Sequence, residues 1–240
     1  MMCPICRNLP FNVFAVEAGE GDFKSTFWIC ECGHCNARFD KRTYQIDFDS
    51  DKLSQAAVNR EFYDVGMNEE RVSEELEINR GMISGFMPFV NDRSLYVEIG
   101  CGLGFLTRAA SPYFEQCIGL DLEVETAESI DCQIPNVKFE LHDNFLGRFT
   151  GNISALAAWH VLEHLPEPHG MLGDLFSKIS RSGIFFGQVP LFKTDYVMDA
   201  HYIFYDEVSL CKLTRPHGFV PLYMQRDEGN SFLSFCFRKI

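Results

Sequence analysis

Long hydrophobic runs and an excess of positive charge are both missing from this 240-residue sequence. A membrane-spanning helix needs about 18 or more consecutive apolar residues, and the most apolar windows, 153–162 and 184–192, are shorter. The first residues lack a charged start followed by an apolar core, so we expect no signal peptide and no membrane partner. These absences predict a cytoplasmic protein with reduced thiols.

Basic residues are also scarce, because 21 Lys and Arg stand against 34 Asp and Glu, for a formal net charge of −13. Nucleic-acid affinity comes largely from Lys and Arg that displace counterions from phosphates, so this balance argues against a nucleic-acid partner. Residues 1–50 repeat the pattern, with five basic residues and seven acids. At 46% hydrophobic residues the chain can still bury a core.

Short apolar runs alternate with helix-like segments after residue 92. This alternation predicts an α/β fold with a parallel sheet covered by helices on both faces. The last two runs are expected to form a hairpin. The expected strands are 95–99, 117–120, 137–141, 153–159, 184–186, 219–224 and 231–237, and the expected helices are 105–110, 124–130, 171–179 and 206–214.

An acid-rich helix is expected before this domain, because residues 61–79 hold seven acids and one Arg. Apolar residues recur there at helical spacing and predict one buried stripe opposite a solvated acidic face. The stripe consists of Val72, Leu76, Ile83, Met87 and Val90. We therefore divide the chain into an N-terminal module (1–50), a helical linker or lid (51–91) and a main domain (92–240).

A glycine-rich turn follows the first expected strand. Glu98 lies near the end of that strand, and Gly100, Gly102 and Gly104 follow before a helix. Glycines at such a turn let the backbone approach a ligand near a helix N-terminus. The dinucleotide fingerprint G-x-G-x-x-G needs a small residue at the position of Phe105, so the spacing departs from it.

Two further acids end the next two expected strands. Asp121, 23 residues after Glu98, can accept both hydroxyls of a ribose. Asp143 can accept from an adenine amino group while Phe145 packs on the ring. All three acids fall at the edge where open α/β sheets bind ligands. The alternative is that Asp121 and Asp143 only cap helices.

Three stretches carry a resemblance to a known family: YVEIGCGLG at 96–104, GLD at 119–121 and WHVLEHLPEP at 159–168. They resemble the class I S-adenosylmethionine-dependent methyltransferases, and the VLEH stretch is similar to the subgroup that methylates small molecules, including quinones and sugars. Residues 183–190 and 201–205 also resemble later motifs of that family. The resemblance covers about residues 60–240 and implies a Rossmann-like, seven-stranded methyltransferase sheet.

This resemblance also implies binding roles at the cofactor. The first strand's acid and glycines would bind the methionine part, the second strand's acid the ribose, and the third strand's end the adenine. A cationic sulfonium agrees with an acid-lined cleft. The expected cofactor contacts are Glu98, Gly100, Gly102, Gly104, Asp121, Leu122, Asp143, Asn144, Phe145, His160 and, as a lid residue, Tyr63.

Methyl transfer requires aligned reactants and, for many acceptors, the removal of a proton. Histidine is the natural base near neutral pH. We expect His160 and His201, which follow the fourth and fifth strands, to face the acceptor, with Glu163 and His164 next. The alternative is that Glu163 and His164 only fix their loop by hydrogen bonds.

Five of the ten cysteines fall within the first 35 residues. Cys3 and Cys6 form one C-x-x-C knuckle, and Cys32 and Cys35 form a second, a pattern typical of a zinc ribbon. A four-thiolate shell leaves no open position, so the expected Zn²⁺ is structural.

The cysteine pattern leaves two alternatives open. Cys30 or His34 could replace one ligand, and cysteines packed without metal are the alternative. Residues 32–39 also resemble short zinc modules attached to some sugar and natural-product methyltransferases.

Together these patterns predict a methyltransferase that acts on a small polar metabolite, such as a sugar or nucleotide-linked sugar. Methylation of RNA or protein is one alternative. A non-catalytic protein that binds the cofactor and uses the ribbon for a protein contact is another. A homo-oligomer, or the ribbon with the acidic helix, could complete the acceptor site.

Overall fold

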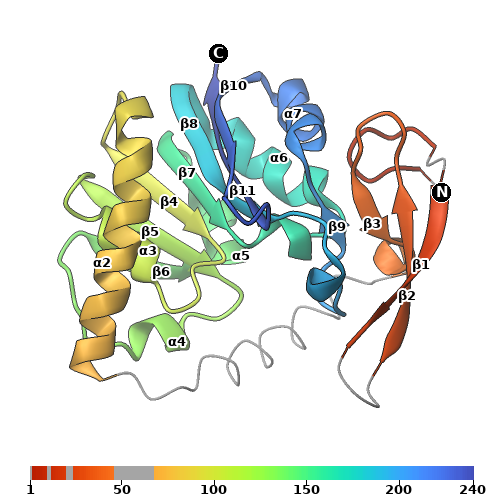
Figure 1. Cartoon of the computed structure of the whole chain (residues 1–240). Helices are drawn as coiled ribbons and strands as arrows, with labels where there is room; N and C mark the ends of the chain where they lie inside the picture. Colours follow the sequence, from red (N-terminus) through yellow and green to blue (C-terminus); the bar gives the residue numbers. More distant parts are fainter. Residues whose placement is uncertain (1, 10–11, 20–23, 46–67) are drawn as a thin grey trace.

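The computed structural model describes residues 2–9, 12–19, 24–45 and 68–240 (Figure 1). Their strands form two sheets, a seven-stranded sheet in the order β10-β11-β8-β7-β4-β5-β6 and a four-stranded sheet in the order β1-β2-β3-β9. No helix in this part of the chain has the length and apolar character needed to span a bilayer. The expected lid residue, Tyr63, lies outside the described residues.

The larger sheet confirms the expected Rossmann-like architecture. β4 pairs in parallel with β5 on one side and β7 on the other, so the strand order reverses at β4. β8 continues the parallel part, and β11 and β10 close the edge as an antiparallel hairpin. The strands are β4 (Leu95–Ile99), β5 (Gln116–Asp121), β6 (Val137–Leu141), β7 (Ile153–Trp159), β8 (Ile179–Pro190), β10 (Phe219–Arg226) and β11 (Phe232–Lys239).

Burial explains why these runs form strands. All five residues of β4 and the first six of β7 are buried, as expected for central strands covered on both faces. Helices supply that cover. They are α2 (Glu69–Phe86), α3 (Phe105–Ala110), α4 (Glu125–Glu128), α5 (His142–Arg148), α6 (Pro168–Lys178) and α7 (Glu207–Thr214).

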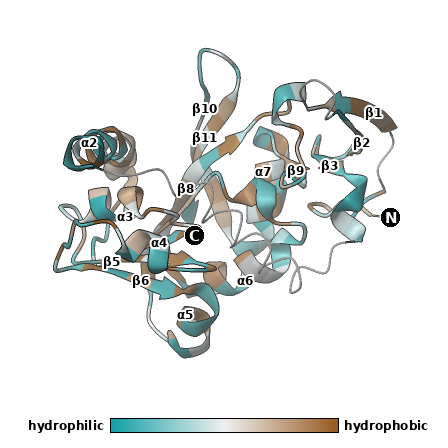
Figure 2. Cartoon of the chain, turned by 90° about the horizontal axis from the view of Figure 1, so that it is seen from below, coloured by the Kyte–Doolittle hydropathy of each residue, from teal (hydrophilic) through white to brown (hydrophobic). Residues whose placement is uncertain are grey.

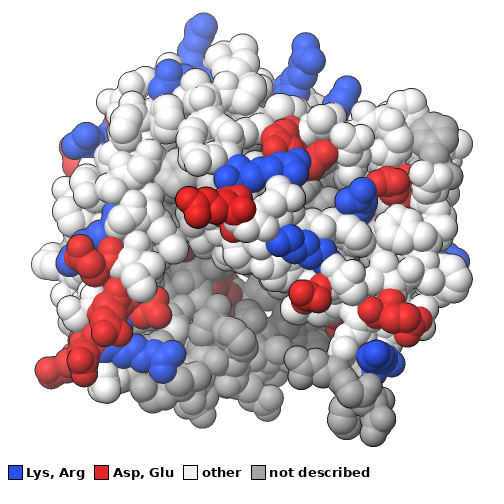
Figure 3. All heavy atoms as spheres, viewed as in Figure 1, with Lys and Arg blue, Asp and Glu red and all other residues white. Residues whose placement is uncertain are grey.

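The acid-rich helix α2 begins after Asn68, whose side chain accepts the Arg71 backbone N–H. Leu76, Ile83 and Phe86 are its buried residues, and the helix packs against α3 (Figure 2). Four of its five acids are exposed, and Figure 3 shows acidic side chains gathered where α2 lies. The predicted amphipathic helix is therefore present, with its first expected residues outside the described part.

Three differences from the predicted elements are larger than a shift of a few residues at one end. β8 begins at Ile179 instead of residue 184, because it follows α6 without a loop. Residues 142–148 form α5, which was not among the expected helices, so Asp143 lies in a helix and not at a strand end. β9 (Ile203–Phe204) was not predicted, since a two-residue strand carries no periodic signal and exists only through its partner β3.

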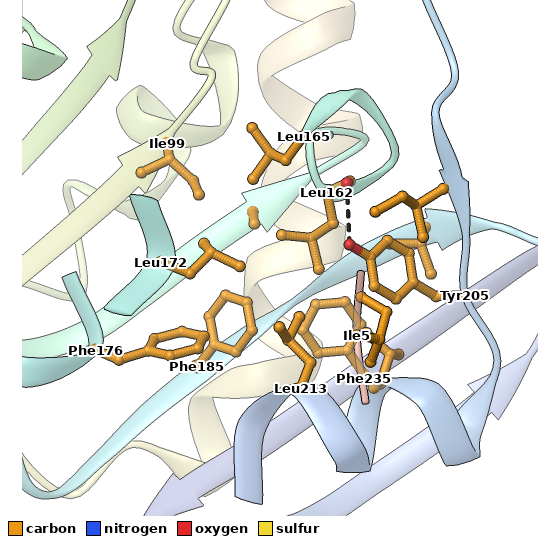
Figure 4. Close-up of a cluster of buried hydrophobic side chains, with 14 of the residues drawn as sticks. Ile5, Ile99, Leu162, Leu165, Leu172, Phe176, Phe185, Tyr205, Leu213 and Phe235 are labelled. Atoms are coloured by element: carbon orange, nitrogen blue, oxygen red, sulfur yellow. Dashed lines mark hydrogen bonds between the residues drawn. The ribbon is translucent and has the colours of Figure 1, made fainter. Parts of the chain in front are cut away.

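The N-terminal module contains β1 (Asn12–Ala18), β2 (Ser25–Glu31) and β3 (Arg38–Asp40), all antiparallel. It shares a core with the larger sheet, because Ile5 belongs to the same buried cluster as Leu162, Tyr205 and Phe235 (Figure 4). The module is thus packed directly on the main domain. The boundaries 1–50, 51–91 and 92–240 stay a prediction.

Candidate active site

The glycine-rich turn between β4 and α3 uses backbone conformations that favour glycine. Gly100, Gly102 and Gly104 have φ of +63°, +49° and +73°. A Cβ on Gly100 would lie 2.4 Å from Val161 Cγ2, and one on Gly104 would lie 2.4 Å from Phe139 Cε1. The turn therefore needs glycine both for its dihedral angles and for the space around it.

Two buried carboxylates lie beside this turn. Glu98 is 3% exposed and accepts a hydrogen bond from the Thr107 hydroxyl. Burial, together with the negative charge of Asp121, raises the pKa of Glu98 to about 8. Asp121 accepts the backbone N–H groups of Gly102 at 2.8 Å and Leu122 at 2.7 Å, and burial raises its pKa. The structure thus brings both predicted acids and the glycine turn together, where a cationic ligand would offset their repulsion.

The third predicted acid lies differently. Asp143 is exposed at the start of α5, 3.3 Å from His142 Nδ1, and Asn144 follows it at the surface. Phe145 is 1% exposed and stacks on Phe149 with ring centroids 4.6 Å apart. An adenine contact would require this ring to leave its core packing, so the predicted adenine contacts stay predictions.

The segment after β7 carries the predicted acceptor residues. His160 has φ of +53°, an uncommon conformation outside glycine, and its N–H donates to the Gln188 carbonyl at 3.0 Å. Its side chain is 38% exposed, and its Nδ1 lies 3.5 Å from Glu163 Oε1. Strained backbone of this kind is often found at functional sites.

Glu163 and His164 lie on the short 3-10 helix η3 (Leu162–His164), and His201 approaches them from the chain before β9. The rings of His164 and His201 lie 4.8 Å apart. Their Nδ1 atoms contact the carbonyl oxygens of Ala200 at 2.8 Å and Tyr196 at 2.7 Å. Burial and the neighbouring His164 lower the pKa of His201. The structure therefore gathers all four predicted acceptor-side residues at one edge.

The four predicted zinc ligands also form a cluster. Their sulfur atoms all lie within 4.8 Å of one another, and both the Cys3–Cys35 and the Cys6–Cys32 pairs are 3.5 Å apart. A tetrahedral shell with Zn–S bonds of about 2.3 Å places sulfurs about 3.8 Å apart, so the residues present fit a zinc ion. Cys30 and His34 are not members of this cluster among the described residues.

The sequence also matches a known protein family. Residues 76–223 match the model of a family described as a methyltransferase domain, which is more than half of the chain. The chain belongs to this methyltransferase family. With the strand order of the large sheet, the match confirms the expected class I S-adenosylmethionine-dependent methyltransferase. No curated protein matches the chain in sequence.

Solved structures resemble this methyltransferase in fold. The 1,6-didemethyltoxoflavin N1-methyltransferase of Burkholderia thailandensis, with bound S-adenosylhomocysteine, is 16% identical, with a TM-score of 0.60 over 94% of this chain and 99% of that one. The magnesium protoporphyrin IX methyltransferase of Synechocystis PCC 6803, also with bound S-adenosylhomocysteine, is 15% identical, with a TM-score of 0.54 over 83% and 98%.

A third structure contains a protein partner. It is the Haloferax volcanii complex of the Trm112 methyltransferase activator with a methyltransferase, which is 11% identical, with a TM-score of 0.56 over 80% of this chain and 97% of that one.

The N-terminal module reaches η3 through backbone hydrogen bonds that no sequence pattern indicates. The Tyr202 N–H donates to the Glu163 carbonyl at 2.7 Å, and the Asp40 N–H donates to the Tyr202 carbonyl at 2.9 Å. Backbone bonds thus connect β3 of the module, the segment before β9, and η3. No local signal could reveal this connection, because Asp40 and Tyr202 are more than 100 positions apart and both bonds use only main-chain atoms.

A cavity of about 450 Å³ lies between the module and the main domain, lined by residues that include Arg38, Phe192, Phe204 and Arg226. None of the predicted site residues is among its described lining residues. Both arginines are already paired, Arg38 with Glu31 and Arg226 with Glu207. We therefore place the candidate active site at the glycine turn and the η3 edge.

Proposed function

We propose that this methyltransferase transfers the methyl group of S-adenosylmethionine to a small polar metabolite, such as a sugar or a nucleotide-linked sugar. The observation that carries the donor assignment is the position of Asp121, at the end of β5 and 2.8 Å from the Gly102 backbone nitrogen. A carboxylate at this sheet edge suits the two hydroxyls of a ribose. The bound S-adenosylhomocysteine of the Burkholderia and Synechocystis enzymes supports the same donor class.

Each donor contact then follows from the chemistry of the groups at the turn. Glu98, as a carboxylate, would hold the ammonium group of the methionine part, and the glycine turn would give the donor close backbone approach. Asp121 would hold the ribose, and Asp143 with Asn144 the adenine. When bound, the donor supplies a methyl group activated on a sulfonium; the chain's task is to hold it in line with the acceptor.

A polar acceptor is supported by the groups at the other edge. Three histidines and one buried carboxylate meet there, and His160 is exposed enough to take a proton from an acceptor hydroxyl. Val161, the residue after His160, contacts the space at Gly100, so this edge lies against the donor turn. The net charge of −13 disfavours RNA as the acceptor.

The Cys cluster is proposed to hold a structural zinc ion, because a four-sulfur shell has no open position for water or substrate. Its role would be to fold the module that packs behind η3. The module could also bind a partner protein, as the Haloferax methyltransferase binds its activator. Zinc binding by the cysteines does not by itself imply this second role.

The test is a calorimetric titration of S-adenosylmethionine into the protein and into an Asp121→Ala variant, with Asp143→Ala compared. We expect Asp121→Ala to weaken donor binding at least tenfold, about 1.4 kcal/mol, and Asp143→Ala to weaken it less, because its side chain is exposed. Release of S-adenosylhomocysteine is then measured with nucleotide-linked sugars, free sugars, RNA and peptides.

Each result has a distinct meaning. Turnover with a sugar acceptor supports the proposal. Turnover with RNA or a peptide alone would replace the acceptor class, and donor binding without any turnover would favour a non-catalytic binding protein. No donor binding would overturn the proposal entirely.

A further inference from the structure

A second group of metal-type ligands lies at the acceptor edge. The ligand atoms of Glu163, His164 and His201 all lie within 4.8 Å of one another. Glu163 is 1% exposed, and both histidines are half-buried. Unlike the four sulfurs of the module, this set combines two imidazoles with one carboxylate.

The histidines are oriented as metal ligands usually are. Carbonyl oxygens can only accept, so the contacts of the two Nδ1 atoms with Ala200 and Tyr196 require a proton on each Nδ1. The neutral rings then carry their lone pairs on Nε2. Metal-binding histidines commonly donate their other ring N–H to a backbone carbonyl in this way, which fixes the tautomer and the ring orientation.

The carboxylate lacks a compensating donor. Among the described residues, Glu163 Oε2 is buried without a hydrogen-bond partner, and the single ion pair of Glu163 is with His160. A buried carboxylate oxygen without a donor is costly. Each of the three side chains brings one possible ligand atom within 4.8 Å of the others, so a cation bound between them would compensate the buried carboxylate oxygen.

We propose that Glu163, His164 and His201 bind a divalent transition-metal ion whose open positions take an oxygen of the acceptor. Two imidazoles and one carboxylate favour transition metals over Mg²⁺ or Ca²⁺, and three protein ligands leave positions for water or substrate. Bonds of about 2.1 Å place tetrahedral ligands about 3.4 Å apart, which lies within the 4.8 Å that separates these ligand atoms at most.

The proposed metal site lies close to the glycine turn, so a bound metal could position the acceptor beside the methyl donor. η3 follows Val161, whose side chain fills the space at Gly100. As part of the proposed methyl transfer, on which this step rests, an acceptor hydroxyl bound to the metal loses its proton to His160. Its oxygen then forms a bond to the methyl carbon as the carbon–sulfur bond breaks, and that electron pair stays on sulfur.

Cobalt(II) added to the full-length protein as purified tests the site without measuring activity. We expect one equivalent to bind with visible ligand-field bands and without the strong sulfur-to-metal absorption that the Cys cluster would give. Proton NMR should show two exchangeable, strongly shifted N–H signals, one from each Nδ1. His201→Ala and Glu163→Gln should each weaken cobalt binding at least tenfold, whereas His217→Gln, outside the cluster, should not.

The proposal fails if cobalt binds only with sulfur-type absorption, if it does not bind, or if His201→Ala and Glu163→Gln bind it as tightly as the parent. Should a variant not fold, absence of the two shifted N–H signals in the parent protein overturns the site by itself. Calorimetry with S-adenosylmethionine separates the two proposals: donor binding without a cobalt site defeats the metal proposal alone, and a cobalt site without donor binding defeats the methyl-transfer proposal alone.

Discussion

The two edges of the candidate active site are built in different ways. The donor edge comes from one strand–helix–strand unit, in which Glu98, the glycine turn and Asp121 lie within 24 consecutive residues. The acceptor edge combines η3, the chain before β9, and the module, which meets them through β3 and the Asp40–Tyr202 backbone bond.

A local sequence motif positions the functional groups at the donor edge, whereas tertiary packing positions those at the acceptor edge. At the donor edge, backbone angles and short hydrogen bonds fix each group, so changes there should act locally. At the acceptor edge, the position of η3 depends on a core that contains Ile5 of the module and Leu162 of η3 itself. Changes far away in the sequence should therefore alter the position of η3.

The largest expected effect comes from Cys32→Ser, which removes one sulfur from the Cys cluster. Structural zinc contributes roughly 10 kcal/mol or more to the folding of small zinc domains, so we expect the module to unfold. Hydrogen exchange should rise in β1, β2 and the segments at η3 and β9, while β4 and β5 stay protected. Metal analysis should show the loss of one zinc per chain.

Cys30→Ser is the matched control, because Cys30 is also fully buried but lies outside the cluster. It should keep its zinc and cost about 1–3 kcal/mol for a buried hydroxyl. If Cys32→Ser kept full protection in β1 and β2, the module would not depend on metal. If protection were lost there but kept at η3, the proposed dependence of the acceptor edge would be wrong.

Gly100→Ala should have the next largest effect, because Gly100 is where the two edges touch. A left-handed alanine costs about 1–2 kcal/mol, and its methyl group would press on Val161. We expect donor affinity to fall at least tenfold. Val161→Ala, added to it, should restore part of that loss in a double-mutant cycle measured by calorimetry.

Gly104→Ala gives the comparison within the same turn, since its methyl group would meet Phe139 and Arg108 instead. Its loss should not respond to Val161→Ala. Purely additive losses for Gly100→Ala and Val161→Ala would show that the turn and the acceptor segment are not coupled.

The same contrast explains what the sequence could predict. Asp121 and the glycine turn could be placed because strand ends, glycines and acids within one βαβ unit carry their own spacing signal. The cluster of four cysteines could be predicted for the same reason, because each C-x-x-C pair is a local motif. The docking of the module was not predictable, because it depends on the two-residue β9 and on main-chain bonds between distant residues. α5 was missed because the chain turns into a helix directly after Leu141.

The stability of the protein should also depend on pH through Glu98, whose folded pKa of about 8 lies above its usual 4.5. The folded protein binds the Glu98 proton more tightly than the unfolded chain does. The resulting contribution to the free energy of unfolding is fully present below pH 4.5 and is lost as the pH rises through 8. The slope is at most about 1.4 kcal/mol per pH unit. Glu98→Gln should remove that part of the pH dependence in urea unfolding between pH 5 and 8.5.

Donor affinity should have the opposite pH dependence, because a cationic donor needs the Glu98 carboxylate. It should therefore rise with pH in the parent protein but not in Glu98→Gln. Asp121, whose pKa is also raised, remains in both proteins, so their difference isolates Glu98. Equal pH slopes in the two proteins would show that Glu98 does not titrate in this range.

The smallest effect is expected at the surface of the module. Arg7 pairs with Glu167 of the turn before α6, but both side chains are more than half exposed, so water screens the pair. Arg7→Ala should lower the free energy of unfolding by less than about 0.5 kcal/mol. Glu167→Ala should cost about 1 kcal/mol, because Glu167 also caps α6 by accepting the Gly170 N–H at 2.8 Å. If Arg7→Ala instead released the module, seen as faster hydrogen exchange at η3, docking would rest on surface charge rather than on the shared core.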